Sequence, residues 1–334
     1  MRTPQEPVGS GFGAASTTND VIQGIDLSGK TAVVTGGYAG LGLETTRTLA
    51  SAGARVVVPS RDLEKARRAL AGIEQVEIEA MDLIDPESVE AFAGRFLASG
   101  RSLDILINSA GIMALPERTL DDRGYEYHFA TNHLGHFQLT TQLLPALRAA
   151  KGARVVSVSA WAHRLSDVVF DDVNFARREY KPMLGYAQSK TANILFAVGL
   201  DAREKENGVR AFALHPGSIL TDLGRNFTEE QLKAFGVLDA SGKRIPDPSR
   251  QLKTIEQCAA TQVWCATSSR LNGLGGVYCE NVEIARVVPH DERSGWASDD
   301  SSRKVGVMPH AINPASAERL WSASVEMIGT SART

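Results

Sequence analysis

A tyrosine and a lysine lie four residues apart, at Tyr186 and Lys190, in a stretch whose helical pattern runs through Glu206. Residues at this spacing share one face of a helix. A nearby ammonium favours the phenolate, so Lys190 is expected to lower the pKa of Tyr186 from its ordinary value of about 10. Such a phenol can give a proton to a carbonyl oxygen or take one from an alcohol. Taken alone, the spacing equally describes a surface tyrosine stacked on a lysine stem.

A glycine-rich segment, residues 35–42 with the sequence TGGYAGLG, follows an apolar run and opens a helical pattern that stops at Gly53. A phosphate group needs backbone N–H groups and a helix N-terminus close by, so a loop that binds one carries few side chains. In such a loop Gly36 permits the tight turn, Gly40 lets the backbone approach a pyrophosphate, and Gly42 allows the helix to pack close to the strand. An ordinary tight turn between a strand and a helix has the same appearance.

Short apolar segments rich in Val, Ile and Leu alternate with helical patterns, as is typical of strands that are buried on both faces of a parallel sheet. The expected strands are residues 31–35, 55–59, 76–80, 103–108, 154–159, 209–215 and 276–279. This alternation predicts an α/β fold of the Rossmann type, a doubly wound parallel sheet of about seven strands. Ligands of such sheets bind beyond the carboxyl ends of the strands, and both motifs above lie there.

The chain is expected to form a polar N-terminal arm, residues 1–24, followed by a single domain, residues 25–334. Asp62 is a candidate helix cap, and Asp85 with Pro86 marks another helix start. Two long segments interrupt the alternation, and long insertions near a site are often lids. Residues 222–253 are interpreted as a substrate lid. Residues 162–184 are equally compatible with a binding role and with a solvated loop.

Composition excludes several classes of function. The 334 residues are 43% hydrophobic and 22% charged, with a net charge of −3, and no basic stripe suggests a nucleic-acid partner. No apolar run approaches the roughly 20 residues that span a membrane, and no signal peptide is evident, so a cytoplasmic protein without a membrane partner is expected.

Three cysteines, Cys258, Cys265 and Cys279, suggest buried packing and no disulfide framework. No cluster has convincing metal-ligand spacing; His133 and His136 read as core residues.

Six motifs occur together in one order: residues 35–42, Asp82-Leu83, the stretch NSAG at 108–111, Asn132 within TNH, Tyr186 to Lys190, and PGSILT at 216–221. In this, the chain from about Asp26 to about Met327 resembles the short-chain dehydrogenase/reductase family. The stretches NHLGHF at 132–137 and QSKTAN at 188–193 are most similar to its retinol-dehydrogenase-like branch.

The resemblance implies an NADP(H)-dependent oxidoreductase that interconverts a ketone or aldehyde and an alcohol. In the catalytic set that the resemblance implies, Tyr186 is the acid/base. Lys190 lowers the pKa of Tyr186 and binds the nicotinamide ribose, and Asn132 holds a water of the proton relay. The resemblance also implies a homodimer or homotetramer, paired through the helices that bear Asn132 and Tyr186. The implied cofactor-binding residues are Gly36, Tyr38, Gly40, Leu41, Gly42, Ser60, Arg61, Asp82, Leu83, Asn108, Ala110, Gly111, Tyr186, Lys190, Pro216, Gly217 and Thr221.

The choice between NADP(H) and NAD(H) depends on the end of the second strand. NAD-specific sites usually have an acidic residue there, which binds the ribose 2′-hydroxyl. Here the strand ends in Pro59, Ser60 and Arg61. Arg61 can pair bidentately with a 2′-phosphate, so NADP(H) is favoured over NAD(H). The alternative is that Arg61 merely begins a solvated helical turn beside Asp62.

The fourth catalytic residue of the family, a serine, is where this chain departs from the pattern. The second serine of the family's strand end corresponds to Ala160 in the sequence Val158-Ser159-Ala160-Trp161. Ser159 is taken as the candidate catalytic serine, and His163 is a second candidate donor. If neither serves, one donor to the substrate oxygen is missing, which can cost roughly 100- to 1000-fold in rate. The alternative function is therefore a catalytically depleted, NADP-binding regulatory or scaffold protein. A nucleotide-sugar epimerase uses the same Tyr-Lys pair, but no separate sugar domain follows residue 222.

Overall fold

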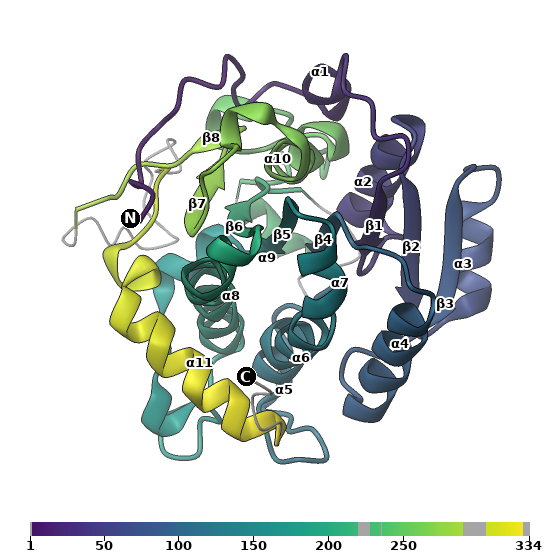
Figure 1. The fold of residues 1–334 in the computed structure, drawn as a ribbon. Coiled ribbons are helices and arrows are strands. Elements are labelled where there is room, and N and C mark those ends of the chain that lie inside the picture. The colour runs from purple at the N-terminus through teal and green to yellow at the C-terminus, as the bar shows by residue number, and fades with distance from the viewer. Residues whose placement is uncertain (1, 220–227, 235, 290–304, 330–334) are drawn as a thin grey trace.

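The computed structural model of this protein describes residues 2–219, 228–234, 236–289 and 305–329. Its centre is one eight-stranded sheet with the order β3-β2-β1-β4-β5-β6-β7-β8 (Figure 1). The strands are β1 (Thr31–Val34), β2 (Arg55–Ser60), β3 (Val76–Ala80), β4 (Ile105–Asn108), β5 (Ala153–Val158), β6 (Val209–His215), β7 (Val277–Glu280) and β8 (Glu283–Ile284).

All seven predicted strands are present, and they are parallel. The addition is β8, a two-residue strand that pairs antiparallel with β7. The chain reverses its direction of winding at β1, which has β2 on one side and β4 on the other. A crevice forms where the winding reverses, beyond the carboxyl ends of the strands, and this is where such sheets bind ligands.

The central strands are buried on both faces because alternate residues enter two separate cores. Val33, with its neighbours on β2 and β4, packs into one core, whereas Val34 packs into the other. The first core lies under α4 (Pro86–Ala98), α6 (Gly135–Gln142), α8 (Pro182–Glu204) and α11 (Pro314–Ile328). The second core lies under α2 (Gly40–Ser51), α3 (Leu63–Leu70) and α10 (Ile255–Thr267). The doubly wound architecture predicted from the sequence is therefore confirmed.

The predicted helix starts are also observed. Asp62 caps α3 by accepting from the amide of Lys65, and Asp85 caps α4, which has Pro86 in its first turn. The remaining elements are α1 (Thr18–Ile22), α5 (Tyr127–Phe129), the π-helix η1 (Ala130–Leu134), α7 (Leu144–Ala149), α9 (Glu229–Ala234) and the 3-10 helices η2 (Trp161–Leu165), η3 (Phe170–Asp172), η4 (Lys205–Asn207), η6 (Pro248–Arg250), η7 (Ser269–Leu271) and η8 (Pro309–Ile312).

The N-terminal segment runs along the outer edge of the sheet (purple in Figure 1). The Gln5 side chain binds the backbone N–H and C=O of Tyr278 in β7, and the Glu283 carboxylate of β8 accepts from the amides of Val8 and Ser10. Beyond this edge, Thr18 donates to Glu44 of α2 at 2.6 Å.

Candidate active site

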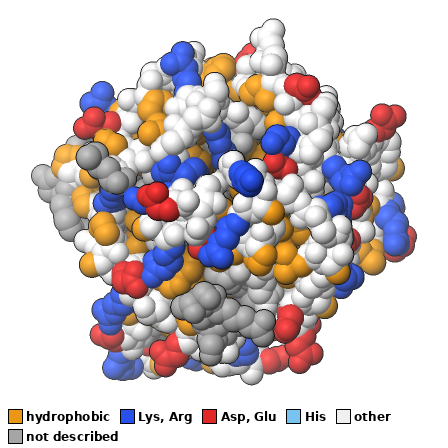
Figure 2. Space-filling model, in the orientation of Figure 1, with side chains coloured by type: hydrophobic (Ala, Val, Ile, Leu, Met, Phe, Trp, Pro, Cys, Tyr) orange, Lys and Arg blue, Asp and Glu red, His pale blue; other side chains and the backbone are white. Residues whose placement is uncertain are grey.

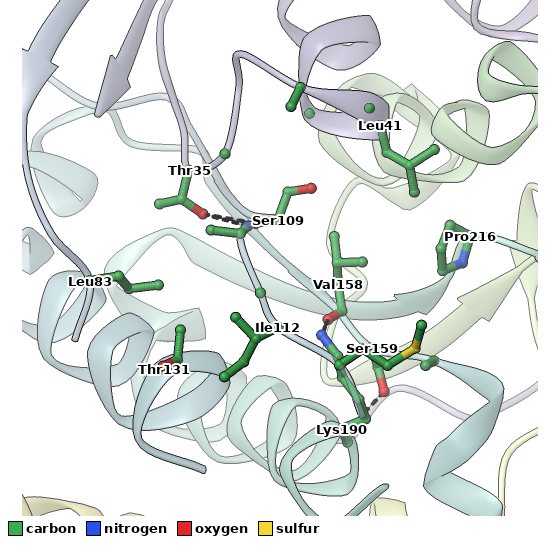
Figure 3. A pocket seen from close by; sticks show the side chains of 18 of the residues that line it. Thr35, Leu41, Leu83, Ser109, Ile112, Thr131, Val158, Ser159, Lys190 and Pro216 are labelled. Carbon is green, nitrogen blue, oxygen red and sulfur yellow. Dashed lines mark hydrogen bonds between the residues drawn. The ribbon is translucent and has the colours of Figure 1, made fainter. Parts of the chain in front are cut away.

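A cavity of about 420 Å³ opens at the carboxyl ends of the strands (Figure 3). Its walls come from the glycine loop after β1, the ends of β2, β4, β5 and β6, and the first half of α8. The sequence-predicted residues that line it are Gly36, Tyr38, Gly40, Leu41, Gly42, Ser60, Arg61, Asp82, Leu83, Ala110, Gly111, Ser159, Tyr186, Lys190, Pro216 and Gly217. The structure therefore brings residues from across the chain to one site.

Of the remaining predicted residues, Asn108 and Asn132 are described and do not line the cavity. Thr221 lies outside the described residues. Asn108 is buried behind the wall, where its side chain donates to Thr140 at 3.2 Å, so it supports the sheet end and does not line the cavity. Asn132 is likewise behind the wall, and Gly111 lies between it and the cavity.

The glycine loop forms a cradle that side chains would fill. Gly36 has a φ of +67°, in the left-handed region that favours glycine. A Cβ at Gly42 would lie 2.3 Å from the carbonyl oxygen of Gly36, which no other residue type can accept. The N-cap of α2 is Ala39, which has no side-chain oxygen to cap the first helical N–H groups. The cradle therefore fits a phosphate group.

Thr35 joins this loop to the rest of the site through one hydroxyl. Its Oγ1 accepts from the amides of Ser109 and Ala110 at 2.9 and 3.0 Å (Figure 3). His136 Nδ1 donates to the carbonyl of Asn132, which leaves Nε2 to accept from the Thr35 hydroxyl at 2.9 Å. Burial lowers the pKa of His136 to about 4, so the ring is neutral and this tautomer is maintained.

The end of the cavity beside β2 is positively charged. Ser60, Arg61 and Lys65 line it, and Asp82 is the only carboxylate among the described lining residues. The Ser60 hydroxyl is engaged locally with the backbone of Asp62. Sequence reasoning did not identify Lys65. The signal was available, because Asp62 caps the helix and places Lys65 in the first turn, close to the strand end.

Tyr186 and Lys190 lie on one face of α8, as predicted, and both are buried. The Lys190 Nζ lies 5.6 Å from the centre of the Tyr186 ring and donates to the carbonyl of Val158 at 2.9 Å. Burial raises the pKa of Tyr186, which is opposite to the lowering that the Tyr-Lys spacing predicts, and burial lowers the pKa of Lys190 to about 7. Loss of hydration disfavours the charged form of both groups. The phenol therefore holds its proton.

Asn132 lies in the π-helix η1, a local widening that often occurs at functional sites. Its Nδ2 donates to Ser189 of α8 at 2.9 Å, and its Oδ1 accepts from the amide of Ile112 at 2.9 Å. Asn132 thus joins the loop beside the cavity to the helix that carries Tyr186. A Cβ at Gly111 would lie 3.0 Å from Asn132 Oδ1, a tight contact that requires the Asn132 side chain to shift, and 3.6 Å from Lys190 Nζ, an ordinary contact.

The candidate oxygen donors beside Tyr186 are already engaged with the protein. Ser159 is buried, and its hydroxyl donates to the carbonyl of Lys190 at 2.7 Å (Figure 3). Ala160 packs against Tyr186 in a small apolar cluster. The suggestion that His163 replaces the missing hydroxyl is wrong, because its Nδ1 donates to the carbonyl of Ala160 and its Nε2 accepts from the amide of Met308.

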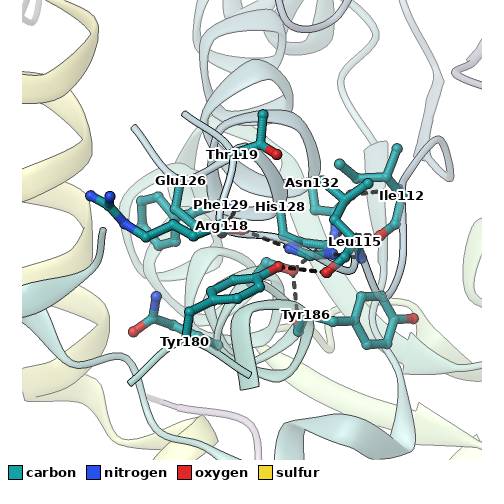
Figure 4. Close-up of polar contacts among 12 residues, drawn as sticks. Ile112, Leu115, Arg118, Thr119, Glu126, His128, Phe129, Asn132, Tyr180 and Tyr186 are labelled. Carbon is teal, nitrogen blue, oxygen red and sulfur yellow. Dashed lines mark hydrogen bonds and ion pairs between the residues drawn. The ribbon is translucent and has the colours of Figure 1, made fainter. Parts of the chain in front are cut away.

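A buried carboxylate and imidazole support the same wall from the other side (Figure 4). Glu126 accepts from His128 Nδ1 at 2.7 Å, and His128 Nε2 accepts from the amide of Leu115 at 3.2 Å. Tyr180 donates to the carbonyl of Leu115 at 2.9 Å. The His128 ring packs edge-on to Tyr186, with centroids 6.2 Å apart. These contacts fix the loop that follows Met113. They could not be predicted from the sequence, because they join residues that follow no spacing rule.

The described part of the chain contains no helix long and apolar enough to cross a membrane, and no group of three or more His, Cys, Asp or Glu residues that could hold a metal ion. His133 and His136 are buried and hydrogen-bonded to Ser324 and Thr35. The three cysteines are buried and free. Basic and acidic side chains are interspersed over the face shown in Figure 2, without a continuous basic stripe.

Comparison with known proteins agrees with the site. The short chain dehydrogenase family profile matches residues 30–232, and the chain belongs to this family. A "Probable oxidoreductase" of Streptomyces lividans is 46% identical over 302 residues, which is 89% of this chain and 97% of that protein. Retinol dehydrogenase 12 of Homo sapiens is 37% identical over 311 residues, 91% of this chain and 88% of that protein, which places the chain in the retinol-dehydrogenase-like branch.

Solved structures show the same architecture. An uncharacterised protein from Mycobacterium paratuberculosis has a TM-score of 0.70 and 31% identity, and the match covers 96% of this chain and all of that one. The RhlG/NADP active-site complex of Pseudomonas aeruginosa has a TM-score of 0.59 and 22% identity, covering 76% of this chain and 94% of that one. At that identity the second similarity supports the fold alone.

Proposed function

We propose that this protein is an NADP(H)-dependent oxidoreductase that interconverts an apolar ketone or aldehyde and its alcohol, with Tyr186 as the acid/base. The observation that carries the proposal is the position of the buried Tyr186–Lys190 pair in the wall of a cavity that also contains a phosphate-sized glycine cradle. A nicotinamide cofactor held there would supply or accept the hydride. The remaining steps fall to residues of the chain.

Tyr186 retains its proton in the buried site and is therefore suited to donate it to a carbonyl oxygen, which favours reduction. Lys190, with a pKa near 7, is suited to replenish that proton and to bind a ribose hydroxyl. The Asn132 side chain is hydrogen-bonded to Ile112 in the loop and to Ser189 in α8, and so holds both segments in place beside Tyr186 and Lys190. Its hold on a water of the proton relay stays a prediction. The catalytic role that the sequence suggests for Ser159 is also untested, and the bond of its hydroxyl to the carbonyl of Lys190 argues against that role.

The proposed preference for NADP(H) is supported by Arg61 and Lys65, which line the cavity where a ribose 2′-phosphate would bind. A guanidinium and an ammonium are suited to a phosphate, whereas a ribose 2′-hydroxyl is usually held by a carboxylate. Asp82 would accept from the adenine amine. The cytoplasmic location stays a prediction from the sequence.

The proposed substrate class follows from the side chains around Tyr186. Met113, Ala160, Trp161 and Ala162 line this part of the cavity, and Leu232 of α9 and Val237 line it from the segment 222–253. Apolar walls favour an apolar substrate, and the position of Leu232 and Val237 supports a lid role for this segment. A relative in this branch is named a retinol dehydrogenase, which makes long-chain apolar aldehydes and retinal reasonable first candidates.

Titration of the protein with NADPH and NADH, followed by nicotinamide fluorescence, tests the cofactor. NADPH should bind more tightly, and equal or weaker binding would contradict the role of Arg61. Turnover of straight-chain aldehydes with NADPH then tests the chemistry. Tyr186→Phe should abolish that turnover without weakening NADPH binding, and undiminished turnover would exclude Tyr186 as the acid/base.

Ala160 and the engaged Ser159 hydroxyl favour a second candidate, a catalytically depleted NADP-binding regulatory or scaffold protein. It predicts tight NADPH binding together with no turnover of any aldehyde or ketone by the natural chain. Measurable turnover that depends on Tyr186 would eliminate this second candidate.

A further inference from the structure

Helices α6 and α8, where the family resemblance implies pairing between subunits, are covered in this protein by its own C-terminal helix. Helix α11 crosses α8 beside η1 and α6 (yellow in Figure 1). The Trp321 ring lies 4.9 Å from that of Phe137 on α6 and 6.1 Å from that of Phe196 on α8, measured between centroids. A large aromatic side chain at this position fills the space between the two helices.

Close backbone approach and polar contacts hold α11 in place. A Cβ at Gly199 of α8 would lie 3.4 Å from the carbonyl oxygen of Ala317, an ordinary van der Waals contact, so α11 packs directly on this face of α8. At the rim, Arg203 pairs with Glu318 at 2.6 Å, and its guanidinium lies over the Trp321 ring. The outward side of α11 is polar and includes the exposed Glu318 and Ser322.

The edges of the sheet are also occupied. Along β7 and β8, the Gln5 side chain binds backbone groups of Tyr278 and Ala285. The Glu283 carboxylate of β8 accepts in turn from the amides of Val8 and Ser10 in the N-terminal segment. At the opposite edge, β3 carries Glu77 and Glu79, which pair with arginines of neighbouring elements. Charged side chains on an edge strand discourage pairing with another sheet.

One contact joins α11 to the catalytic residues. His133, adjacent to Asn132 in η1, is buried and forms a hydrogen bond of 2.8 Å between Nε2 and the Ser324 hydroxyl of α11. Burial lowers the pKa of His133 to about 3, so the ring is neutral and Nε2 is a partner for an uncharged hydroxyl. The turn that presents Asn132 is therefore fixed from outside by the C-terminal helix.

We propose that α11 takes the place of a partner subunit on the catalytic helices, so that the chain works as a monomer in which Ser324 is a positioning residue for Asn132 through His133. This departs from the homodimer or homotetramer that the family resemblance implies. The positioning part rests on the proposed function, whereas the monomer does not.

Sedimentation of the purified chain tests the monomer without any turnover. A mass of 35.9 kDa from nanomolar to high micromolar protein is expected, with turnover per chain unchanged on dilution. Twice that mass, or activity that is lost on dilution, would overturn the proposal. If the chain is monomeric but turns over no aldehyde, only the proposed function fails.

Ser324→Ala tests the positioning role, with Ser322→Ala as the matched control on the exposed side of the same helix. Ser324→Ala should speed hydrogen exchange several-fold in the peptide that spans residues 130–136 and lower kcat for the best straight-chain aldehyde, while leaving the Kd for NADPH unchanged. Ser322→Ala should alter none of these. Equal exchange in the two variants would refute the bracing of Asn132 by α11.

Discussion

Adding one hydroxyl to the apolar wall beside Tyr186 should make the protein a faster enzyme. Ala160→Ser introduces a hydroxyl at the position that the family gives to its catalytic serine. Ala160 is half-buried, lines the cavity and has an extended backbone with φ −156° and ψ 161°, which serine adopts without strain. The change therefore supplies a hydrogen-bond donor with little disturbance of the fold.

The expected size of the effect follows from the donors that are already present. Tyr186 lines the cavity, whereas the Ser159 proton is directed to the carbonyl of Lys190 at 2.7 Å. Loss of one donor to a developing oxyanion costs about 100- to 1000-fold in rate. Restoring the donor should recover a gain of this size. The new hydroxyl also lies against the apolar cluster that includes Met113 and Leu165, and its desolvation there costs about 1 kcal/mol, which offsets part of the gain. We expect kcat to rise by roughly 10- to 100-fold, since each tenfold change corresponds to about 1.4 kcal/mol of barrier.

The assay is NADPH oxidation with straight-chain aldehydes, with kcat and KM determined separately. Ser159→Ala is the matched control, because it deletes a neighbouring hydroxyl that is bonded to the backbone of α8. It should lower the free energy of unfolding by about 1 kcal/mol and leave kcat nearly unchanged. If Ser159→Ala abolishes turnover and Ala160→Ser adds nothing, then Ser159 is the working donor and this reasoning is refuted.

Three further predictions concern the cofactor, the space beside the pair, and pH. In fluorescence titrations, Arg61→Ala should weaken NADPH binding by roughly 10- to 100-fold and leave NADH binding unchanged. The control is Arg68→Ala, on α3 outside the described cavity wall, which should change the binding of neither cofactor. Gly111→Ala should lower kcat by about tenfold because its Cβ would lie 3.0 Å from Asn132 Oδ1 and displace that side chain. Gly94→Ala, where a Cβ meets open space, should instead stabilise α4 by about 0.5–1 kcal/mol in urea unfolding. The pKa of Lys190 is about 7 in the folded chain and has an ordinary value of 10.5 in the unfolded chain. Between pH 7 and 10.5 the unfolded chain therefore binds more protons, and the free energy of unfolding rises with pH. Near pH 7, Lys190→Met should be more stable than the natural protein by at most roughly 5 kcal/mol, and this difference should shrink toward pH 10. A difference that stays constant with pH would contradict the lowered pKa.

The fold was predictable because its strands are buried on both faces and therefore read as short apolar runs. The exception, β8, is instructive. Only Glu283 and Ile284 form it, too few residues for a periodic pattern. The turn before it places Asn281 and Val282 at φ +53° and +61°, conformations for which a β-branched valine gives no sequence signal.

Most of the residues that line the cavity were predictable from the sequence, but the direction of the Tyr186 pKa shift was not. Spacing placed Tyr186 and Lys190 on one face of a helix, but the complete burial that reverses the expected pKa of Tyr186 depends on packing from distant segments. The bond from Ser159 to the carbonyl of Lys190 likewise joins a strand end to a helix 31 residues away. Asn108 was misplaced because a motif gives the order of residues and not the side of the wall on which each one lies.

The hydroxyl of Thr35 has a consequence for how the protein folds. It joins groups separated by 74, 75 and 101 residues along the chain, at Ser109, Ala110 and His136. Contacts so distant in sequence form only after several strands have assembled, because each requires a long loop to close first. The glycine cradle is therefore completed late in folding. A nucleotide that binds this cradle would bind the folded chain and not the unfolded one, and would therefore stabilise the protein and slow its proteolysis.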